Sequence, residues 1–412
     1  MTGAATFAVV AAIATGSVPA TAKPLLIGLT SDASGQYANS GASDRRGMLM
    51  AIEEFNAKGG VMGREIKTIH IDTETTPATG SRVAERMITR EKVGFMIGAV
   101  SSGVANAISQ VAQKYGVVYL NTNSSSPTES GKNCHRVKFV WDGNGKNFAQ
   151  AAVQNAVNKY GKKWLLMTND YVWGHNTSKA TRQLAEAAGA KIIDEIMIPQ
   201  GTRDFSSALL KIQQASPKVI AAAVGGDDQK AMRTQISQLD MGAKYAWINN
   251  QQDWPDVYGL PAKNLFGVFG TTWYYKFDLP GVEEFNAKYA KMYPDTKMKV
   301  PGNVFFNGYW ATRSLLEAIE AAGTTENHAV IKQLENLRIP AATRMQHDDA
   351  FMNPNTHQMQ QTIYLATANL ASKDKDDMFQ IVAHASPAAV NDASSNETCK
   401  LESMADTPKY TP

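Results

Sequence analysis

Apolar runs with the length of β-strands alternate with stretches of helical periodicity along most of this 412-residue chain. Each run ends in a polar or glycine-rich turn, and the stretch after it repeats apolar residues at helical spacing. The predicted strands cover residues 24–30, 65–72, 95–100, 117–120, 164–168, 192–198, 219–224, 245–249 and 265–270. This alternation predicts right-handed crossovers and a parallel sheet that helices cover on both faces. Because the pattern restarts after residue 140 with similar length, we predict an α/β fold class with two similar lobes.

The most regular part of the pattern is a strand–helix–strand unit between residues 94 and 126. Polar loops follow both of its strands, at residues 101–103 and 121–126. In an open parallel sheet such strand ends lie side by side and line a ligand crevice. Ser101 and Ser102 stand where a helix N-cap belongs, next to free backbone N–H groups that favour an anion. The simpler alternative is that the two serines only cap the helix.

Polar or aromatic side chains follow six of the predicted strands. They are Tyr37 and Ser40, Ser101 and Ser102, Asn123, Ser124 and Ser125, Tyr171 and Trp173, Asp227 and Asp228, and Gln251 and Asp253. Each set alone is typical of a loop, but six sets on one edge, split between two lobes, favour a cleft for a small polar molecule. Ser102 and Ser125 would hold an anionic group. Asp227 or Asp228 would suit a cation, and Trp173 would stack on the ligand or face the cation.

Composition and motifs narrow the range of functions. The chain has 43% hydrophobic and 19% charged residues, as an ordinary globular protein does. Its formal net charge of +3 gives no basic stripe, so we expect no nucleic-acid partner. The patterns H-E-x-x-H, G-x-x-x-x-G-K-[ST] and G-x-S-x-G are absent from the sequence, and the histidines lack metal-ligand spacing. We therefore expect a binding protein without a cofactor or metal, and not an enzyme. An exported amide hydrolase is an open alternative, because catalytic residues can converge from distant segments.

Residues 1–22 differ from the rest of the chain, since they carry no charged side chain. An apolar run at residues 7–14 precedes Ala20-Thr21-Ala22, which has the small-x-small form of a signal-peptidase site. We interpret this segment as a secretory signal peptide, with a mature chain that begins at Lys23 and works in the periplasm. The apolar run is too short to span a membrane.

The sequence has two cysteines, Cys134 and Cys399. In an exported protein an even pair predicts one disulfide, here between mid-chain and the C-terminal tail, and two unpaired thiols are the alternative. Residues 387–412 are rich in Ala, Ser, Asn, Asp and Pro. This composition predicts a loosely held tail that the disulfide pins to the rest of the protein.

Five stretches carry a resemblance to a known family. They are the opening strand with Ser34-Gly35 and Gly41, AIEEFNAKGGVMGREIKTIHID at 51–72, GAVSSGVANAISQVAQKYGVVYL at 98–120, Ser126-Pro127, and DYVWG at 170–174. The stretch 51–72 contains the string I-x-x-x-N-x-x-G-G-[IV]-x-G, and the order and spacing of all five are specific. On these residues the chain resembles the type I periplasmic solute-binding proteins of ABC importers, in the Leu/Ile/Val-binding group, over residues 23–384.

The resemblance implies two Rossmann-like lobes with parallel sheets, joined by three hinge crossovers that let the lobes close on a ligand. The first lobe would comprise residues 23–141 and 272–343, and the second lobe residues 142–271 and 344–386. Members of the family capture a small solute and deliver it to the membrane permease of an ABC transporter, and they are expected to be monomers. A sensor that passes its signal to a regulator is the alternative.

The resemblance also places candidate ligand contacts by position. Ser102 and the carbonyl of Val100 fall on the family's first contact loop. Asn123 and Ser125 fall on the second contact loop. Trp173 takes the aromatic position before the glycine of a second-lobe loop.

Two positions depart from the family's amino-acid binders. Asp227 and Asp228 stand where those proteins carry an aromatic residue. The stretch 250–253 stands where they place a glutamate for the ammonium group. An amino acid or related compound is the first ligand class that we expect. An amide, a urea-like molecule or an aromatic acid is the alternative.

Overall fold

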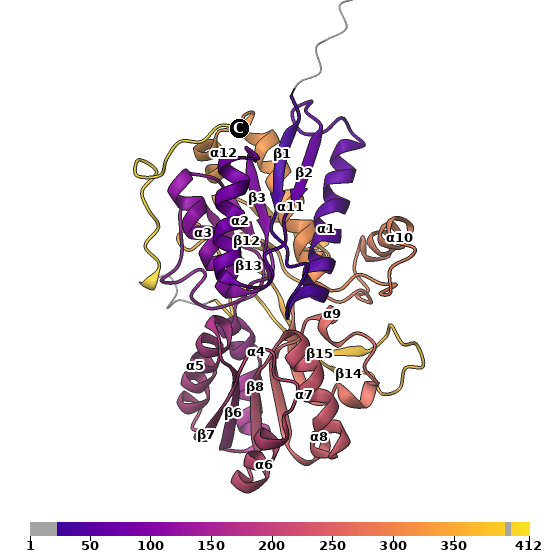
Figure 1. The fold of residues 1–412 in the computed structure, drawn as a ribbon. Coiled ribbons are helices and arrows are strands. Elements are labelled where there is room, and N and C mark those ends of the chain that lie inside the picture. The colour runs from indigo at the N-terminus through magenta and orange to yellow at the C-terminus, as the bar shows by residue number, and fades with distance from the viewer. Residues whose placement is uncertain (1–22, 392–396) are drawn as a thin grey trace, which may run out of the picture.

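The computed structural model describes residues 23–391 and 397–412, and the expected signal peptide lies outside these residues. Figure 1 shows two lobes, one above the other, each with a central sheet flanked by helices. The expected α/β class with two lobes is therefore confirmed. Within the described ranges, no helix has both the length and the apolar character that crossing a membrane requires.

The first lobe is built on a five-stranded sheet in which every pair of neighbours is parallel. In the order in which they lie, its strands are β2 (Ile66–His70), β1 (Leu25–Leu29), β3 (Phe95–Gly98), β4 (Tyr119–Asn121) and β5 (Lys138–Val140). The central strands β3 and β4 are buried along their whole length. Helices cover both faces of such a sheet, which is why these strands read as continuous apolar runs in the sequence.

Helices from two distant parts of the chain cover this sheet. They are α1 (Ala38–Asn56), α2 (Pro77–Thr89), α3 (Ser102–Tyr115), α11 (Asn303–Ala322) and α12 (Asn327–Glu335), and α10 (Val282–Met292) packs against α11 at the side of the lobe. The backbones of α1 and α11 lie very close together. A Cβ atom on Gly47 would lie 2.1 Å from the carbonyl oxygen of Phe305, and one on Gly308 would lie 2.5 Å from that of Asp44. Only glycine fits at these two contacts.

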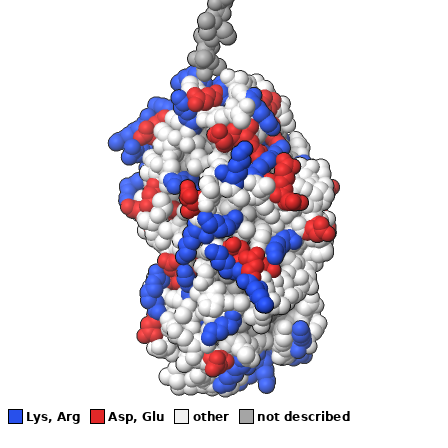
Figure 2. Space-filling view, turned by 90° about the vertical axis from the view of Figure 1, so that its right-hand side faces the viewer, with Lys and Arg blue, Asp and Glu red and all other residues white. Residues whose placement is uncertain are grey.

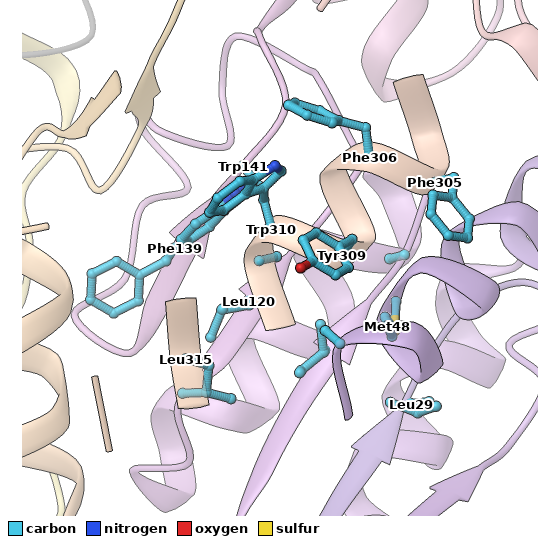
Figure 3. Packing of buried hydrophobic residues seen from close by; sticks show 14 of the residues in the cluster. Leu29, Met48, Leu120, Phe139, Trp141, Phe305, Phe306, Tyr309, Trp310 and Leu315 are labelled. Atoms are coloured by element: carbon cyan, nitrogen blue, oxygen red, sulfur yellow. The ribbon is translucent and has the colours of Figure 1, made fainter. Parts of the chain in front are cut away.

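Large side chains of α11 connect the core of the first lobe to the region between the lobes. Figure 3 shows Phe306 and Trp310 of α11 in the same cluster as Met48 of α1 and Leu120 of β4. Phe306 also stacks on Trp273, with ring centroids 4.9 Å apart. A helix from the C-terminal half of the chain thus completes the core of the N-terminal lobe.

The second lobe has a seven-stranded mixed sheet. In spatial order its strands are β15 (Phe379–Ala385), β14 (Ile363–Ala368), β10 (Val268–Thr271), β9 (Ala246–Gln251), β8 (Val219–Ala223), β6 (Lys163–Asn169) and β7 (Lys191–Ile198). The strands β6 to β10 pair in parallel, but β14 is antiparallel to both β10 and β15. Parallel pairing thus covers the alternating strands of the lobe and does not extend to this edge. Between β14 and β15, residues 369–378 form a loop without a crossover helix, and such a connection joins antiparallel strands.

The helices of the second lobe alternate with its parallel strands, as the sequence predicts. They are α4 (Gly145–Tyr160), α5 (Val172–Ala187), α6 (Ser206–Ala215), α7 (Gly226–Gln238) and the short α8 (Met241–Lys244) and η1 (Ala262–Asn264). A further short helix, α9 (Trp254–Val257), follows β9 and lies close to α1 of the first lobe.

The third crossing between the lobes lies later in the chain than expected. The strands β11 (Arg338–Ile339), β12 (Ala350–Met352) and β13 (Met359–Gln360) form a small sheet. The short helix α13 (Ala341–Arg344) lies between β11 and β12 in the chain. This segment belongs with the first lobe, because Gln358 bridges to Val140 of β5. The chain therefore crosses just before β14, and not at residues 343–344. Strands of two or three residues leave no periodicity from which the sequence could have located this point.

Side chains that precede the third crossing donate hydrogen bonds to backbone carbonyls at the first and second crossings. Gln361 donates to the carbonyl of Trp141 at 2.7 Å, and Gln346 donates to that of Thr272 at 2.7 Å. The buried guanidinium of Arg344 donates to both glutamines, at 2.9 Å to Gln346 and 2.7 Å to Gln361. Three separate passages of the chain are held together by this one set of hydrogen bonds.

The predicted disulfide between Cys134 and Cys399 is present. The tail beyond it is held along its length, contrary to our expectation of a loose segment. The backbone of Tyr410 exchanges hydrogen bonds with Asn327, and its hydroxyl donates to the carbonyl of Val93 at 2.6 Å. These partners are remote in sequence, so composition alone could not reveal them.

We expect the double variant Cys134→Ser, Cys399→Ser to lower the free energy of unfolding by about 2–5 kcal/mol, because the bond closes a long loop in the unfolded chain. The two cysteines are 265 residues apart. Urea unfolding of the mature protein measures the change. Reduction of the wild-type protein should give the same shift, and an unchanged urea midpoint would contradict the prediction.

Candidate ligand-binding site

A narrow cavity lies between the two lobes, at the carboxyl ends of their parallel strands. The residues that line it are Tyr37, Val100, Asn123, Ser125, Tyr171, Trp173, Gly225, Gln229, Gln251, Asp253 and Asp256. The first four follow strands of the first lobe, and the others follow β6, β8 and β9 of the second. Six of the twelve ligand-contact candidates from the sequence are in this lining.

The strand end that brings Val100 to the cavity has an unusual backbone. Gly98 and Ala99 both have positive φ angles, of 135° and 79°. A non-glycine residue adopts a positive φ only at a cost, and such residues cluster at binding sites. This turn directs the chain from β3 to the start of α3.

The polar side chains of the first lobe that reach the cavity already form hydrogen bonds with other residues of the protein. The amide nitrogen of Asn123 donates to Asp44 Oδ1 at 2.8 Å and to the carbonyl of Val304 at 3.2 Å. The hydroxyl of Ser125 donates to Gln251 Oε1 at 2.6 Å, across the cleft. These groups therefore hold the two lobes and the loops in place.

Four predicted serines are buried beside the cavity but are not part of its lining. Ser102 Oγ accepts a hydrogen bond from the backbone N–H of Ser126 at 3.2 Å. Ser40 donates to Asp256 Oδ1 at 2.7 Å. Ser101 occupies the N-cap of α3, and Ser124 follows the first-lobe strand β4. The structure thus gives Ser102 a role in joining the two loops.

Asp227 and Asp228 do not line the cavity, contrary to the arrangement expected from the sequence. Asp228 is buried and pairs with Arg203 at 3.0 Å, and its other oxygen accepts from Asn169 at 3.1 Å. Asp227 lies 3.5 Å from the same guanidinium. Because both carboxylates pair with Arg203 outside the lining, the acidic groups that face the cavity are Asp253 and Asp256.

The sequence analysis missed Gly225, Gln229 and Asp256 as lining residues. Gly226, next to Gly225, has a φ of 62° and brings the backbone of α7 against the first lobe, where Asp227 N donates to the carbonyl of Gln36 at 3.2 Å. The two adjacent glycines, Gly225 and Gly226, are the feature of the sequence that could have indicated this close approach of the backbones. Asp256 left no comparable signal, because it sits in a helix of only four residues.

Aromatic rings form one wall of the cavity. The ring centroids of Tyr37 and Tyr171 are 6.2 Å apart, and those of Tyr171 and Trp173 are 6.1 Å apart. The hydroxyls of the two tyrosines are hydrogen-bonded across the cleft. Burial raises the pKa of both tyrosines far above its usual value, so both are neutral phenols at neutral pH. The indole N–H of Trp173 and the amide oxygen of Gln229 are buried and have no hydrogen-bond partner among the described residues.

Three buried carboxyl groups meet at the cavity and the first crossing. Gln251 Nε2 donates to Asp142 Oδ2 at 2.7 Å and to Asp253 Oδ1 at 3.2 Å. Burial raises the pKa of Asp253 to about 6. Burial and the charge of Asp253 raise the pKa of Asp256 to about 8 and hold that of Asp142 well above its usual value. Within the described ranges, no Lys, Arg or His lines the cavity.

The structure contains no group of three or more His, Cys, Asp or Glu side chains in the described part of the chain that could hold a metal ion. Figure 2 shows one face of the molecule, on which basic and acidic side chains are interspersed.

Comparison with known proteins identifies the family. The sequence model of the periplasmic binding protein family matches residues 24–376, and the chain belongs to that family. It is 28% identical over 355 residues to Leu/Ile/Val-binding protein homolog 7 of Brucella suis biovar 1, which covers 81% of this chain and 86% of that protein. This places the chain in the branched-chain amino acid group of type I periplasmic binding proteins, whose members are solute-binding proteins of the ABC transporter type.

Solved structures support the same fold. A periplasmic binding protein from Burkholderia mallei superposes with a TM-score of 0.82 at 23% identity, and covers 90% of this chain and 97% of its own. A solute-binding protein of an ABC transporter from Rhodopseudomonas palustris, in complex with 3,4-dihydroxybenzoic acid, gives a TM-score of 0.77 at 19% identity, with 88% and 98% covered. At these identities the likeness concerns the fold alone.

The raised carboxyl pKa values predict how stability depends on pH. An unfolded aspartate ionises near pH 4, whereas the folded protein keeps Asp256 protonated until about pH 8. The folded state therefore binds more protons between these values, and its stability falls as the pH rises through this window. We expect Asp256→Asn to flatten this decline in melting temperatures measured from pH 5 to 9.

Asp194→Asn is the matched control for this measurement, because it removes an exposed acid of the edge strand β7, outside the cavity. It should keep the pH dependence of the wild-type protein. An unaltered slope in the Asp256 variant would contradict the assignment.

Proposed function

We propose that this protein is the solute-binding component of an ABC importer, exported to the periplasm, which captures a small polar solute between its lobes and delivers it to the membrane permease. The observation that carries the proposal is the polar, aromatic-walled cavity that both lobes line at their strand ends. Type I periplasmic binding proteins close on their ligands at this position, by domain rotation about hinge segments. A monomer is the working form that we propose.

Direct hydrogen bonds across the cleft support closure as the mechanism. Besides the Ser125–Gln251 and Ser40–Asp256 bonds, the side chain of Gln36 donates to the carbonyl of Gly225 at 2.9 Å. A ligand that contacts both lobes adds further bonds only in the closed state, and so shifts the open–closed equilibrium toward closure.

We propose that the ligand is an amino acid or related nitrogen compound that contacts Val100, Asn123, Ser125, Trp173, Gln251 and Asp253. The narrow space between the lining side chains supports a small molecule as the ligand. Its polar atoms include carboxylates and an amide oxygen, which suit a ligand that donates N–H bonds. An amide or urea-like molecule shares that property, and an aromatic acid matches it less well.

The test is a thermal-shift screen of the mature protein against amino acids, amides, urea and aromatic acids, followed by calorimetry on each hit. A ligand that binds the native state raises the melting temperature with its concentration. We expect Trp173→Phe to weaken the binding of a hit about 5- to 100-fold, because it keeps the ring but removes one buried N–H donor.

Trp164→Phe is the control, since Trp164 is buried in the second lobe and its indole N–H donates to Gly161 at 2.9 Å, away from the cavity. It should leave the dissociation constant unchanged. Release of product from an amide during the assay would favour the hydrolase alternative instead. Binding without any effect of the permease on ligand uptake would favour the sensor.

A further inference from the structure

The cavity combines several hydrogen-bond acceptors with few free donors, and no basic side chain of the described residues lines it beside its carboxyl groups. Among amino acids and related nitrogen compounds, we propose that its ligand carries a net positive charge, as an amine or guanidine compound does, in preference to a net-neutral zwitterion or a carboxylic acid. This inference rests on the proposed function, because it names the class of solute that the same cavity takes.

The first argument is charge balance. The carboxyl groups of Asp253 and Asp256 line the cavity, and Asp142 joins Asp253 through the side chain of Gln251. The basic group next to this region, Arg203, pairs with two other carboxylates. Buried carboxylates are stable as anions only beside a positive charge. A zwitterion would bring one such charge and a further carboxylate, whereas a cation brings the charge alone.

The second argument is the accepting capacity of two groups. The side chain of Gln229 is 1% exposed, and its Oε1 has no partner among the described residues. Its Nε2 donates to the carbonyl of Gln251 at 3.2 Å, which fixes the orientation of the amide. The hydrogen bonds that described residues give to Asp253 come from Asn303 and Gln251 and end on Oδ1. Oδ2 of this carboxylate can therefore accept from a ligand.

The third argument is that side-chain donors in the lining are already in use. Both N–H bonds of Asn123 go to Asp44 and Val304, and the hydroxyl of Ser125 goes to Gln251. Among the side-chain nitrogens that line the cavity, the indole N–H of Trp173, 5% exposed, is the buried donor without a hydrogen-bond partner in the described residues. The bond between Tyr37 and Tyr171 uses the hydrogen of only one of the two hydroxyls. These neutral donors suit a hydroxyl or carbonyl of the ligand, but a carboxylate needs more.

The aromatic wall is compatible with the same class of ligand. The rings of Tyr37, Tyr171 and Trp173 line the cavity together with the two carboxylates. Aromatic faces attract a positively charged nitrogen by about 0.5–2 kcal/mol. Ammonium and guanidinium groups thus find rings on one side and oxygen acceptors on the other.

The experiment is calorimetry of the mature protein with probes of four charge classes: putrescine and agmatine as cations, leucine as a zwitterion, urea as a neutral molecule and benzoate as an anion. We expect a cation to bind with the highest affinity, and the affinity to rise between pH 6 and 8.5 as Asp253 and Asp256 lose their protons.

Beside Asp253, the titratable groups near Asp256 are Asp227 of α7, Tyr37 at the start of α1 and Tyr171 before α5.

Two variants locate the effect. Asp256→Asn and Asp253→Asn should each weaken cation binding at pH 8 by at least about tenfold, the range for one lost charge-assisted hydrogen bond. Asp194→Asn removes the same charge from an exposed position of β7 outside the lining and should change the affinity less than about twofold, because water screens an exposed charge. Circular dichroism shows whether each variant is folded. One folded cavity variant is sufficient for the test if the other does not fold.

The possible outcomes separate this inference from the proposed function. If leucine, urea or benzoate binds and neither cation does, the inference is overturned while solute binding stands. If a cation binds but both cavity variants retain its affinity, the inference is overturned as well. If no probe of any class binds, neither proposal is supported and both are rejected for these classes of solute.

Discussion

Buried hydrogen bonding where the chain crosses between the lobes is the constraint on which the rest of the structure depends. The amide of Asn307, on α11, is fully buried at this point. Its Nδ2 donates to Asp142 Oδ1 at 3.0 Å and to Thr272 Oγ1 at 3.4 Å, which belong to the first and second crossings. The same nitrogen reaches Asn123 Oδ1, in the cavity lining, at 3.1 Å. Since a buried polar group left without a partner costs about 1–3 kcal/mol, these segments hold one another in register.

Gln251 extends this network across the cleft. Its oxygen accepts from Ser125 of the first lobe, and its nitrogen donates to Asp142 at the first crossing and to Asp253 in the cavity. A rotation of the lobes about their crossings must therefore alter the hydrogen bonds of the cavity. Ligand contact and hinge geometry are coupled here through one side chain, and no long-range pathway is needed.

The sequence predicted about half of the cavity lining, and the successes share a physical origin. Asn123, Ser125 and Gln251 follow or end parallel strands, and the carboxyl ends of such strands always meet at one edge of a sheet. The failures at Asp227 and Asp228 have another origin. Their partner Arg203 comes from a separate loop, and nothing in the local sequence indicates that it pairs with them.

By itself, the sequence determined the class of fold, the alternation of its elements, the disulfide and the strand ends that carry the site. These features depend on local periodicity, on the pairing of two cysteines and on the geometry of parallel sheets, all of which act over short stretches of chain. Tertiary structure decided the third crossing, the fixed tail and which acids reach the cavity. Asp256 reaches the cavity only because α9 packs against α1 and α7, and Tyr410 is fixed only because Asn327 and Val93 lie beside it. Burial and hydrogen-bond partners depend on residues distant in sequence, so only the folded chain fixes them.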